Sequence, residues 1–154
     1  MIKILFICHG NICRSPMAEF VFKKLINDKG FNNEFEVDSA ATSTEEIGSG
    51  IYPPVKECLI KHDIQFDKHK SRQINRADIE YFDYIVAMEE YNIKNLNRLL
   101  GESNKYSLLL DYTDTPGDID DPWYTGDFET AYKQIEKGCC CLLSKILKTS
   151  INCF

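Results

Sequence analysis

Residues 2–16 read Ile-Lys-Ile-Leu-Phe-Ile-Cys-His-Gly-Asn-Ile-Cys-Arg-Ser-Pro, and this stretch decides the fold. Its first six residues are a short, Ile-rich and almost unbroken apolar run, which is typical of a strand buried on both faces. Ser15 followed by Pro16 indicates a helix start, with Ser15 as N-cap and Pro16 at the first helical position. The stretch therefore predicts a strand that ends near Cys8, a tight loop, and a helix that opens at Ser15.

The loop between this strand and this helix has the composition of an anion site that carries a nucleophile. Backbone N–H groups of such a loop and the positive end of the helix converge on one point, where an anion binds. The helix end, the N–H donors and the cation of Arg14 all favour the thiolate form of Cys8. The planar guanidinium of Arg14 can hold two oxygens of a phosphate at once. We therefore predict phosphoryl transfer to the sulfur of Cys8.

Three further loop residues support this hypothesis. Ser15 can donate a hydrogen bond to the thiolate or to the departing thiol. Gly10 permits a positive φ, and Asn11 tolerates one while its amide ties the loop to neighbouring backbone. The alternative is that Cys8 is a small buried hydrophobic residue and that Arg14 is a surface charge. That alternative does not explain why an arginine stands at the start of a helix, directly after a loop that contains glycine.

A candidate proton donor lies in the long loop predicted at residues 111–126. Phosphoryl transfer from an aryl ester needs a proton on the leaving oxygen, and a carboxylic acid is a natural donor. Pro122 disfavours helix at Asp121 and holds that residue in an extended geometry. We predict Asp121 as the general acid; a turn aspartate before proline is the alternative reading, and Asp120 is the rival acid by proximity.

Aromatic residues are predicted to border the reaction centre. Trp123 and Tyr124, directly after the candidate acid, can form the walls of a slot for a flat aromatic ring. Tyr52 belongs to a Gly-, Ser- and Pro-rich stretch at 47–54 that is typical of a loop, and we place it at the rim of the pocket. We therefore expect an aromatic-lined substrate slot.

The rest of the chain alternates apolar strands with helices. Further strands are predicted at 35–39, 84–88 and 106–110, and helices at 55–62, 76–82, 90–100 and 127–148. This alternation predicts a parallel sheet with helices on both faces, in one domain that spans residues 1–154. Ligands of such sheets bind beyond the carboxyl ends of strands where the strand order reverses, and the loop after Cys8 leaves the first strand at such an end.

Composition limits the partners and the location of the protein. A net charge of −6 over 154 residues argues against a general nucleic-acid binder. The start of the chain lacks the features of a signal peptide, and no apolar run approaches the length of a membrane span. We therefore expect the seven cysteines to be free thiols in the reducing cytoplasm. His62 and His69 show no ligand spacing with each other or with a cysteine, so we predict neither a metal site nor a cofactor.

The stretch Cys-x5-Arg-Ser-Pro resembles the signature of the low-molecular-weight protein tyrosine phosphatases. Gly10-Asn11, Ile12-Cys13 and Met17-Ala18-Glu19 match this family as well. The resemblance extends along the whole chain, through residues 38–43, 72–74, 82–84 and 121–122. It implies an α/β fold of three layers, a doubly wound sheet of four parallel strands in the order 2-1-3-4 with helices on both faces.

The resemblance also implies roles for individual residues. Cys8 is the implied nucleophile, Arg14 the phosphate clamp and Asp121 the general acid and base. Phosphate binding and loop support are implied for His9, Gly10, Asn11, Ile12, Cys13, Ser15 and Ser39, although from the sequence alone Ser39 is as readily a turn serine. A reversible Cys8–Cys13 disulfide that protects the nucleophile is implied too, with simple burial of Cys13 as the alternative. Trp123 stands where tyrosine is common in the family.

The implied activity is hydrolysis of phosphotyrosine in proteins by a metal-free, cytoplasmic monomer or weak homodimer that phosphate-like oxyanions inhibit. Thioredoxin-coupled arsenate reductases share the loop, but they pass oxidation from it to a downstream pair of cysteines. This chain has no cysteine between Cys58 and Cys139, so it lacks the residues for that relay. Protein arginine phosphatases also resemble the chain, typically with Thr where this chain has Ile12. A phosphotyrosine reader without turnover is a rival of another class, and it would be expected to lack the nucleophile or the acid.

Overall fold

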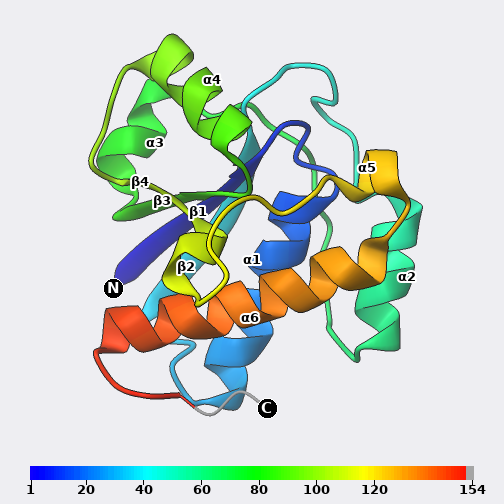
Figure 1. Cartoon of the computed structure of the whole chain (residues 1–154), viewed down its shortest axis with the longest axis vertical. Coiled ribbons are helices and arrows are strands. Elements are labelled where there is room, and N and C mark those ends of the chain that lie inside the picture. The colour runs from blue at the N-terminus through cyan, green and yellow to red at the C-terminus, as the bar shows by residue number, and fades with distance from the viewer. Residues whose placement is uncertain (152–154) are drawn as a thin grey trace.

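The first strand, β1 (Ile2–Cys8), lies between two parallel neighbours in a four-stranded sheet. A computed structural model describes residues 1–151, and in it the strand order is β2-β1-β3-β4, as expected (Figure 1). The other strands are β2 (Phe35–Ala41), β3 (Tyr84–Ala87) and β4 (Tyr106–Leu108). All three strand pairings are parallel, so the carboxyl ends of the strands share one edge of the sheet.

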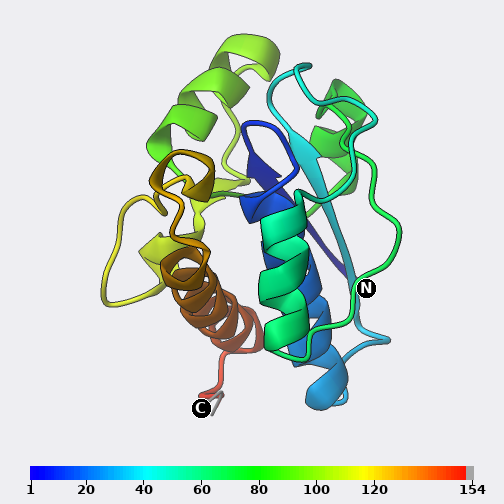
Figure 2. The same cartoon turned by 90° about the vertical axis from the view of Figure 1, so that its right-hand side faces the viewer.

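Helices cover both faces of this sheet and complete three layers (Figures 1 and 2). Alternate residues of β1 point to opposite faces: Ile4 and Phe6 join one apolar cluster, whereas Leu5 and Ile7 join the other. The first cluster is shared with α1 (Arg14–Asp28), α2 (Pro53–Lys61) and α6 (Phe128–Leu147). The second is shared with α3 (Arg76–Tyr81) and α4 (Glu90–Leu100). Burial on both faces explains the unbroken apolar run of β1.

The helix after the loop begins at Arg14, two residues before the predicted first helical position at Pro16, and Ser15 is not its N-cap. The N-cap is Cys13, whose side chain makes no capping bond. The hydroxyl of Ser15 instead lies 3.0 Å from the Cys8 sulfur and accepts a 2.8 Å hydrogen bond from Asn11. The prediction of Ser15 as a cap was therefore wrong, because the loop engages this hydroxyl; the Ser15 N–H donates to the Cys8 sulfur at 3.4 Å.

Two elements near the end of the chain differ from the sequence prediction. The expected strand at 106–110 ends at Leu108 and continues as a 3-10 turn, η1 (Leu109–Tyr112), whose apolar residues pack in the core. A short apolar run does not by itself distinguish a strand from a buried turn. The predicted loop at 111–126 contains a short helix, α5 (Pro122–Thr125), because Asp121 caps it and proline is favoured at its first position.

The expectation of free thiols throughout was wrong at one position. Cys8, Cys13, Cys58, Cys139 and Cys141 are free, but Cys140 is disulfide-bonded. Helix α6 directs the sulfur of Cys139 towards the Ala18 carbonyl of α1, 3.7 Å away, whereas that of Cys140 lies 3.7 Å from the Ile151 carbonyl. Neighbouring helical cysteines thus meet different surroundings. Cys153 and the other residues at the end of the predicted domain, 152–154, lie outside the described residues.

None of the helices within residues 1–151 is both long enough and apolar enough to cross a membrane.

A glycine on α6 allows the closest approach between that helix and η1. A Cβ atom at Gly138 would lie 2.5 Å from Cγ of Leu109, a side chain with no exposed surface. Because Cγ is not the mobile end of the leucine, the methyl group has no free space to enter. Close packing at this point sets the distance between α6 and the turn that follows β4.

We expect Gly138→Ala to lower the free energy of unfolding by about 1–3 kcal/mol, the usual cost of overpacking. This loss would arise although alanine is favoured over glycine in a helix by about 1 kcal/mol. In a Leu109→Ala background, where the space is open, the same substitution should be neutral or stabilising. Urea denaturation of the wild type, the two single variants and the double variant measures the coupling between positions 109 and 138. Equal effects of Gly138→Ala in both backgrounds would contradict the packing argument.

Candidate active site

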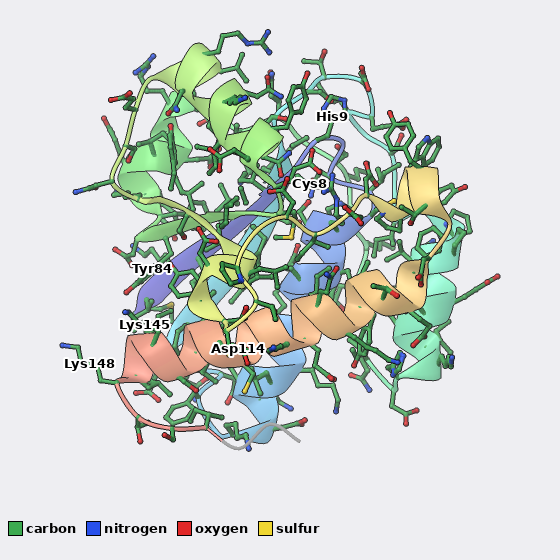
Figure 3. All side chains as sticks on the ribbon, viewed as in Figure 1. Cys8, His9, Tyr84, Asp114, Lys145 and Lys148 are labelled. Carbon is green, nitrogen blue, oxygen red and sulfur yellow. The ribbon has the colours of Figure 1, made fainter. Side chains whose placement is uncertain are left out.

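The candidate site lies at the carboxyl end of β1, at the point where strand order reverses between β2 and β3. Figure 3 shows Cys8 and His9 on the loop that leaves this end of the strand towards α1. A cavity opens over the loop. Its lining consists of loop residues, two glutamates from the segment after β2, and the segment that carries the candidate acid: Cys8, His9, Gly10, Ile12, Cys13, Arg14, Glu45, Glu46, Asp121, Trp123 and Tyr124.

The thiol of Cys8 lies at the base of this cavity among hydrogen-bond donors. Its sulfur accepts from the backbone N–H groups of Asn11 and Ser15, at 3.3 and 3.4 Å, and lies 3.0 Å from the Ser15 hydroxyl. Only 3 % of the residue is exposed. Donors directed at a buried sulfur stabilise negative charge on it, which is the condition for a reactive thiolate.

The buried side chain of Asn11 connects the loop to β2 and to the segment before α3. Its Nδ2 donates to the hydroxyls of Ser15 and Ser39, at 2.8 and 3.0 Å, and its Oδ1 accepts from the Arg72 N–H at 3.3 Å. Ser39 in turn donates to Glu19 at 2.6 Å. Ser39 is thus hydrogen-bonded to Asn11 and is absent from the cavity lining, and its role in loop support stays a prediction.

The loop carbonyls are hydrogen-bonded from outside the cavity. The Gly10 carbonyl accepts from the Ser71 hydroxyl at 2.8 Å, and that of Asn11 lies 2.7 Å from Nε2 of His69. The carbonyl of Ile12 accepts from a backbone N–H at 3.0 Å. Asn11 has a φ of 58°, whereas Gly10 does not use the positive φ that a glycine permits. With the carbonyls bonded outward, the N–H groups of the loop face the cavity.

The guanidinium of Arg14 is 2 % exposed and held between two carboxylates. Its NH1 donates to Glu89 at 2.5 Å and to the Ile119 carbonyl at 2.8 Å, and its NH2 lies 3.3 Å from Asp121. Burial alone would lower the pKa of Arg14, but negative charge at Cys8, Asp121 and Glu89 raises it above its ordinary value. Its buried Nε has no partner among the described residues, so an acceptor entering the cavity would satisfy it.

The carboxylate of Asp121 faces the same cavity from the opposite side. Its Oδ1 accepts from the Trp123 N–H at 3.0 Å, and its Oδ2 is directed at Arg14. The backbone is extended, with φ of −74° and ψ of 113°, as the following proline requires. Asp120, the rival acid, is exposed and absent from the cavity lining.

Two exposed aromatic residues stand at the mouth of the cavity, and a third supports them. Trp123 is 50 % exposed and Tyr124 is 84 % exposed, and both line the opening. Tyr52, predicted as a rim residue, is absent from the residues that line the cavity, and its place at the rim stays a prediction. Its ring packs behind Trp123 at 4.7 Å and against Phe128 at 6.0 Å, because Tyr52 is fixed as the N-cap residue of α2.

The second loop cysteine, Cys13, also lines the cavity and is a free thiol. Burial raises the pKa of this thiol well above its ordinary value, and negative charge at Cys8 and Asp121 raises it further. Both effects favour the uncharged form of the Cys13 thiol. The implied disulfide with Cys8 stays a prediction.

Three carboxylates of the site were missed from the sequence. Glu89 pairs with Arg14, Glu46 lines the cavity, and Glu45 also lines it while pairing with Nε2 of His9 at 2.9 Å. Each follows the carboxyl end of a strand next to β1: Glu89 after β3, and the other two after β2. Polar residues at those positions were the available signal, because parallel strands end at one edge.

Comparison with known proteins gives consistent matches over most of the chain. The family model described as low molecular weight phosphotyrosine protein phosphatase matches residues 3–152. The low molecular weight protein-tyrosine-phosphatase YfkJ of Bacillus subtilis is 41% identical, over 96% of this chain and 97% of its own. The low molecular weight phosphotyrosine protein phosphatase of Rattus norvegicus is 42% identical, over 93% and 94% of the two chains.

Solved structures give the same result for the fold. The crystal structure of YfkJ superimposes with a TM-score of 0.93 at 40% identity, over 96% of each chain. The Drosophila arginine phosphatase superimposes with a TM-score of 0.85 at 30% identity, over 94% of this chain and 98% of that one.

We expect Arg14→Lys to lower the affinity for inorganic phosphate by about 10–100-fold, because hydrogen bonds to charged groups contribute about 1.5–3 kcal/mol and lysine lacks the planar fork. Isothermal titration with phosphate measures the effect. Arg98→Lys, an exposed arginine on α4, is the matched control and should bind phosphate as the wild type does. A folded Arg14→Lys protein with unchanged affinity would contradict the assignment of Arg14 as the anion ligand.

Proposed function

The chain belongs to the family of low molecular weight phosphotyrosine protein phosphatases, and from this premise we propose that it hydrolyses phosphotyrosine in proteins, and small aryl phosphates, through a phosphocysteine intermediate. One observation carries the proposal: Cys8, Arg14 and Asp121 line the same cavity, with the guanidinium of Arg14 3.3 Å from the Asp121 carboxylate. A nucleophile, a cationic clamp and a proton donor are what transfer of a phosphoryl group from an aryl ester requires.

In the first step, the thiolate of Cys8 attacks phosphorus from the base of the cavity. The sulfur–phosphorus bond forms as the bond from phosphorus to the tyrosyl oxygen breaks, and Asp121 delivers its proton to that oxygen. The guanidinium of Arg14 and the inward N–H groups of the loop stabilise the equatorial oxygens. In the free protein Arg14 holds Asp121 at 3.3 Å, and a bound phosphate competes for the same donors. Substrate thereby releases the carboxyl group for its role as acid.

In the second step, a water molecule attacks the phosphocysteine and Asp121 accepts its proton. The sulfur–phosphorus bond breaks, and Cys8 leaves as a thiolate that the Ser15 hydroxyl, 3.0 Å away, and the loop N–H groups stabilise. Inorganic phosphate is the product. Because this product and related oxyanions fit the same donors, they are competitive inhibitors in this proposal. A nucleophilic thiol must stay reduced, which supports the cytoplasm as the place of action.

The mouth of the cavity supports an aromatic substrate. Trp123 and Tyr124 line the cavity and offer apolar faces to an aromatic phosphate ester bound over Cys8. Ile12 also lines the cavity and adds apolar surface where arginine phosphatases typically have threonine. Likeness to the Drosophila arginine phosphatase makes phosphoarginine the comparison substrate for this chain.

The direct test is release of phosphate from a phosphotyrosine peptide, with reductant and without added metal. We expect turnover by the wild type, none by Cys8→Ser, and normal turnover by the matched control Cys141→Ser, a free cysteine on α6 away from the cavity. A phosphoarginine peptide of the same sequence should be hydrolysed far more slowly. Binding of the peptide without turnover by the wild type would favour the reader function, and preference for phosphoarginine would overturn the substrate assignment.

The pH dependence tests the acid. We expect a bell-shaped profile of kcat/KM with its maximum on the acid side of neutral, since Cys8 must be ionised and Asp121 protonated. Activity falls at low pH as the thiolate gains a proton, and at higher pH as the carboxyl group loses one. Asp121→Asn should lower kcat by about 100- to 10,000-fold and flatten the limb at higher pH. Asp120→Asn is the matched control, and identical profiles for both variants would refute the role of Asp121.

A further inference from the structure

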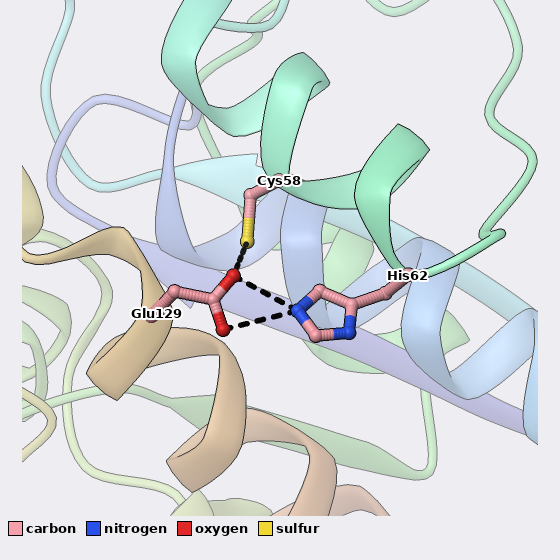
Figure 4. A group of neighbouring side chains, drawn as sticks. All are labelled: Cys58, His62 and Glu129. Carbon is pink, nitrogen blue, oxygen red and sulfur yellow. Dashed lines mark hydrogen bonds and ion pairs between the residues drawn. The ribbon is translucent and has the colours of Figure 1, made fainter.

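A second group of reactive side chains lies outside the active-site cavity, between α2 and α6. Figure 4 shows Cys58, His62 and Glu129 pointing towards one another. Nε2 of His62 lies 2.9 and 3.1 Å from the two oxygens of Glu129, and the Cys58 thiol donates to Glu129 at 3.6 Å. One ligand atom from each of the three lies within 4.8 Å of the others. None of the three lines the active-site cavity.

Helix geometry brings the first two side chains together. Cys58 and His62 are four residues apart, Cys58 within α2 and His62 at its C-cap, so they project from one side of the helix. Glu129 faces them from the first turn of α6. The expectation that His62 has no ligand spacing with a cysteine was therefore wrong, because spacing of four along a helix is such a spacing.

The donor atoms are those of a site for a borderline cation. Thiolate, imidazole and carboxylate are the three ligand types that Zn²⁺ uses in proteins, at about 2.3, 2.0–2.1 and 2.0–2.2 Å. Ligand atoms around such an ion lie about 3–4 Å from one another, which small side-chain movements would reach from the observed arrangement. We propose that Cys58, His62 and Glu129 form a binding site for Zn²⁺ or a similar divalent transition-metal ion.

The surroundings of the cluster suit three protein ligands and one open position. Cys58 is buried, whereas His62 and Glu129 are partly exposed, so a water molecule can complete a tetrahedral site from the solvent side. The His62 ring stacks on Tyr132 at 3.8 Å and 9°, which fixes its plane. The Lys61 ammonium, 3.3 Å from Glu129, is mostly exposed and can turn away to solvent when the metal binds.

Binding of the metal exchanges protons for the ion. Burial raises the pKa of the Cys58 thiol to about 11, and the negative charge of Glu129 acts in the same direction. Coordination displaces the thiol proton and any proton on the imidazole, and both leave to solvent. The ion then joins α2 to the start of α6 by three bonds in place of the hydrogen bonds seen here. Metal binding is therefore expected to stabilise the fold without taking part in the phosphatase reaction.

The test uses Co²⁺ and Zn²⁺ alone, with the full chain in a Cys8→Ser background so that the catalytic thiol cannot bind metal. We expect one equivalent of Co²⁺ to produce a thiolate-to-metal absorption band that Zn²⁺ removes by displacement. Cys58→Ser in this background should abolish the band. Because loss of an outer partner alone costs about 10–100-fold in metal affinity, we expect His62→Gln to weaken Zn²⁺ binding by more than about 100-fold. Glu129→Gln should weaken it too.

Controls separate ligation from misfolding. Cys141→Ser in the Cys8→Ser background removes a free thiol of α6 and should leave the band and its stoichiometry unchanged. Zn²⁺ should raise the Tm of this control but not that of the His62→Gln variant, whose substituted side chain is partly exposed. This comparison tests the metal site even where Cys58→Ser does not fold. Persistence of the band without Cys58, or absence of stoichiometric binding in the Cys8→Ser protein, would overturn the proposal.

Discussion

The backbone of Asn11, held at a φ of 58°, is the constraint on which the active site depends. A left-handed residue reverses the direction of the loop, and the buried Asn11 amide fixes the reversal by bonding to Ser15, Ser39 and the Arg72 backbone. His69 and Ser71 bond the carbonyls of the loop from outside. The N–H groups of Asn11 and Ser15 are thereby directed at the Cys8 sulfur in the free protein, so these donors need no reorganisation when charge develops there.

This arrangement requires a buried cation, Arg14. An arginine with 2 % exposure would be costly alone, and Glu89, the Ile119 carbonyl and Asp121 together compensate for its desolvation. Glu89 lies outside the cavity lining, whereas Asp121 lines the cavity together with Arg14. In the proposed reaction, the same guanidinium holds Asp121 in the free protein and gives it up when phosphate is bound.

Sequence reasoning succeeded where the structure is determined by residues that are close together in the chain. The strand, the loop and the helix within residues 2–16 adjoin one another in the chain, so local residue patterns predicted their order and the position of Cys8 and Arg14. It failed where side chains meet across the fold. Ser15 looks like a helix cap until Asn11 and Cys8 compete for its hydroxyl, and no local pattern shows that Glu89 will face Arg14. The sheet order came from family resemblance, because strand pairing is set by packing of distant segments.

The two halves of the site are anchored by different means. The loop after β1 is held by hydrogen bonds from three segments, whereas Asp121 caps a one-turn helix in which Trp123 packs on Tyr52. Tyr52 in turn packs on Phe128, whose carbonyl and neighbour Glu129 contact Cys58. The position of the acid thus depends on how α2 meets α6. Any interaction that tightens this contact, including a metal ion, would hold the aromatic wall beside the nucleophile more firmly.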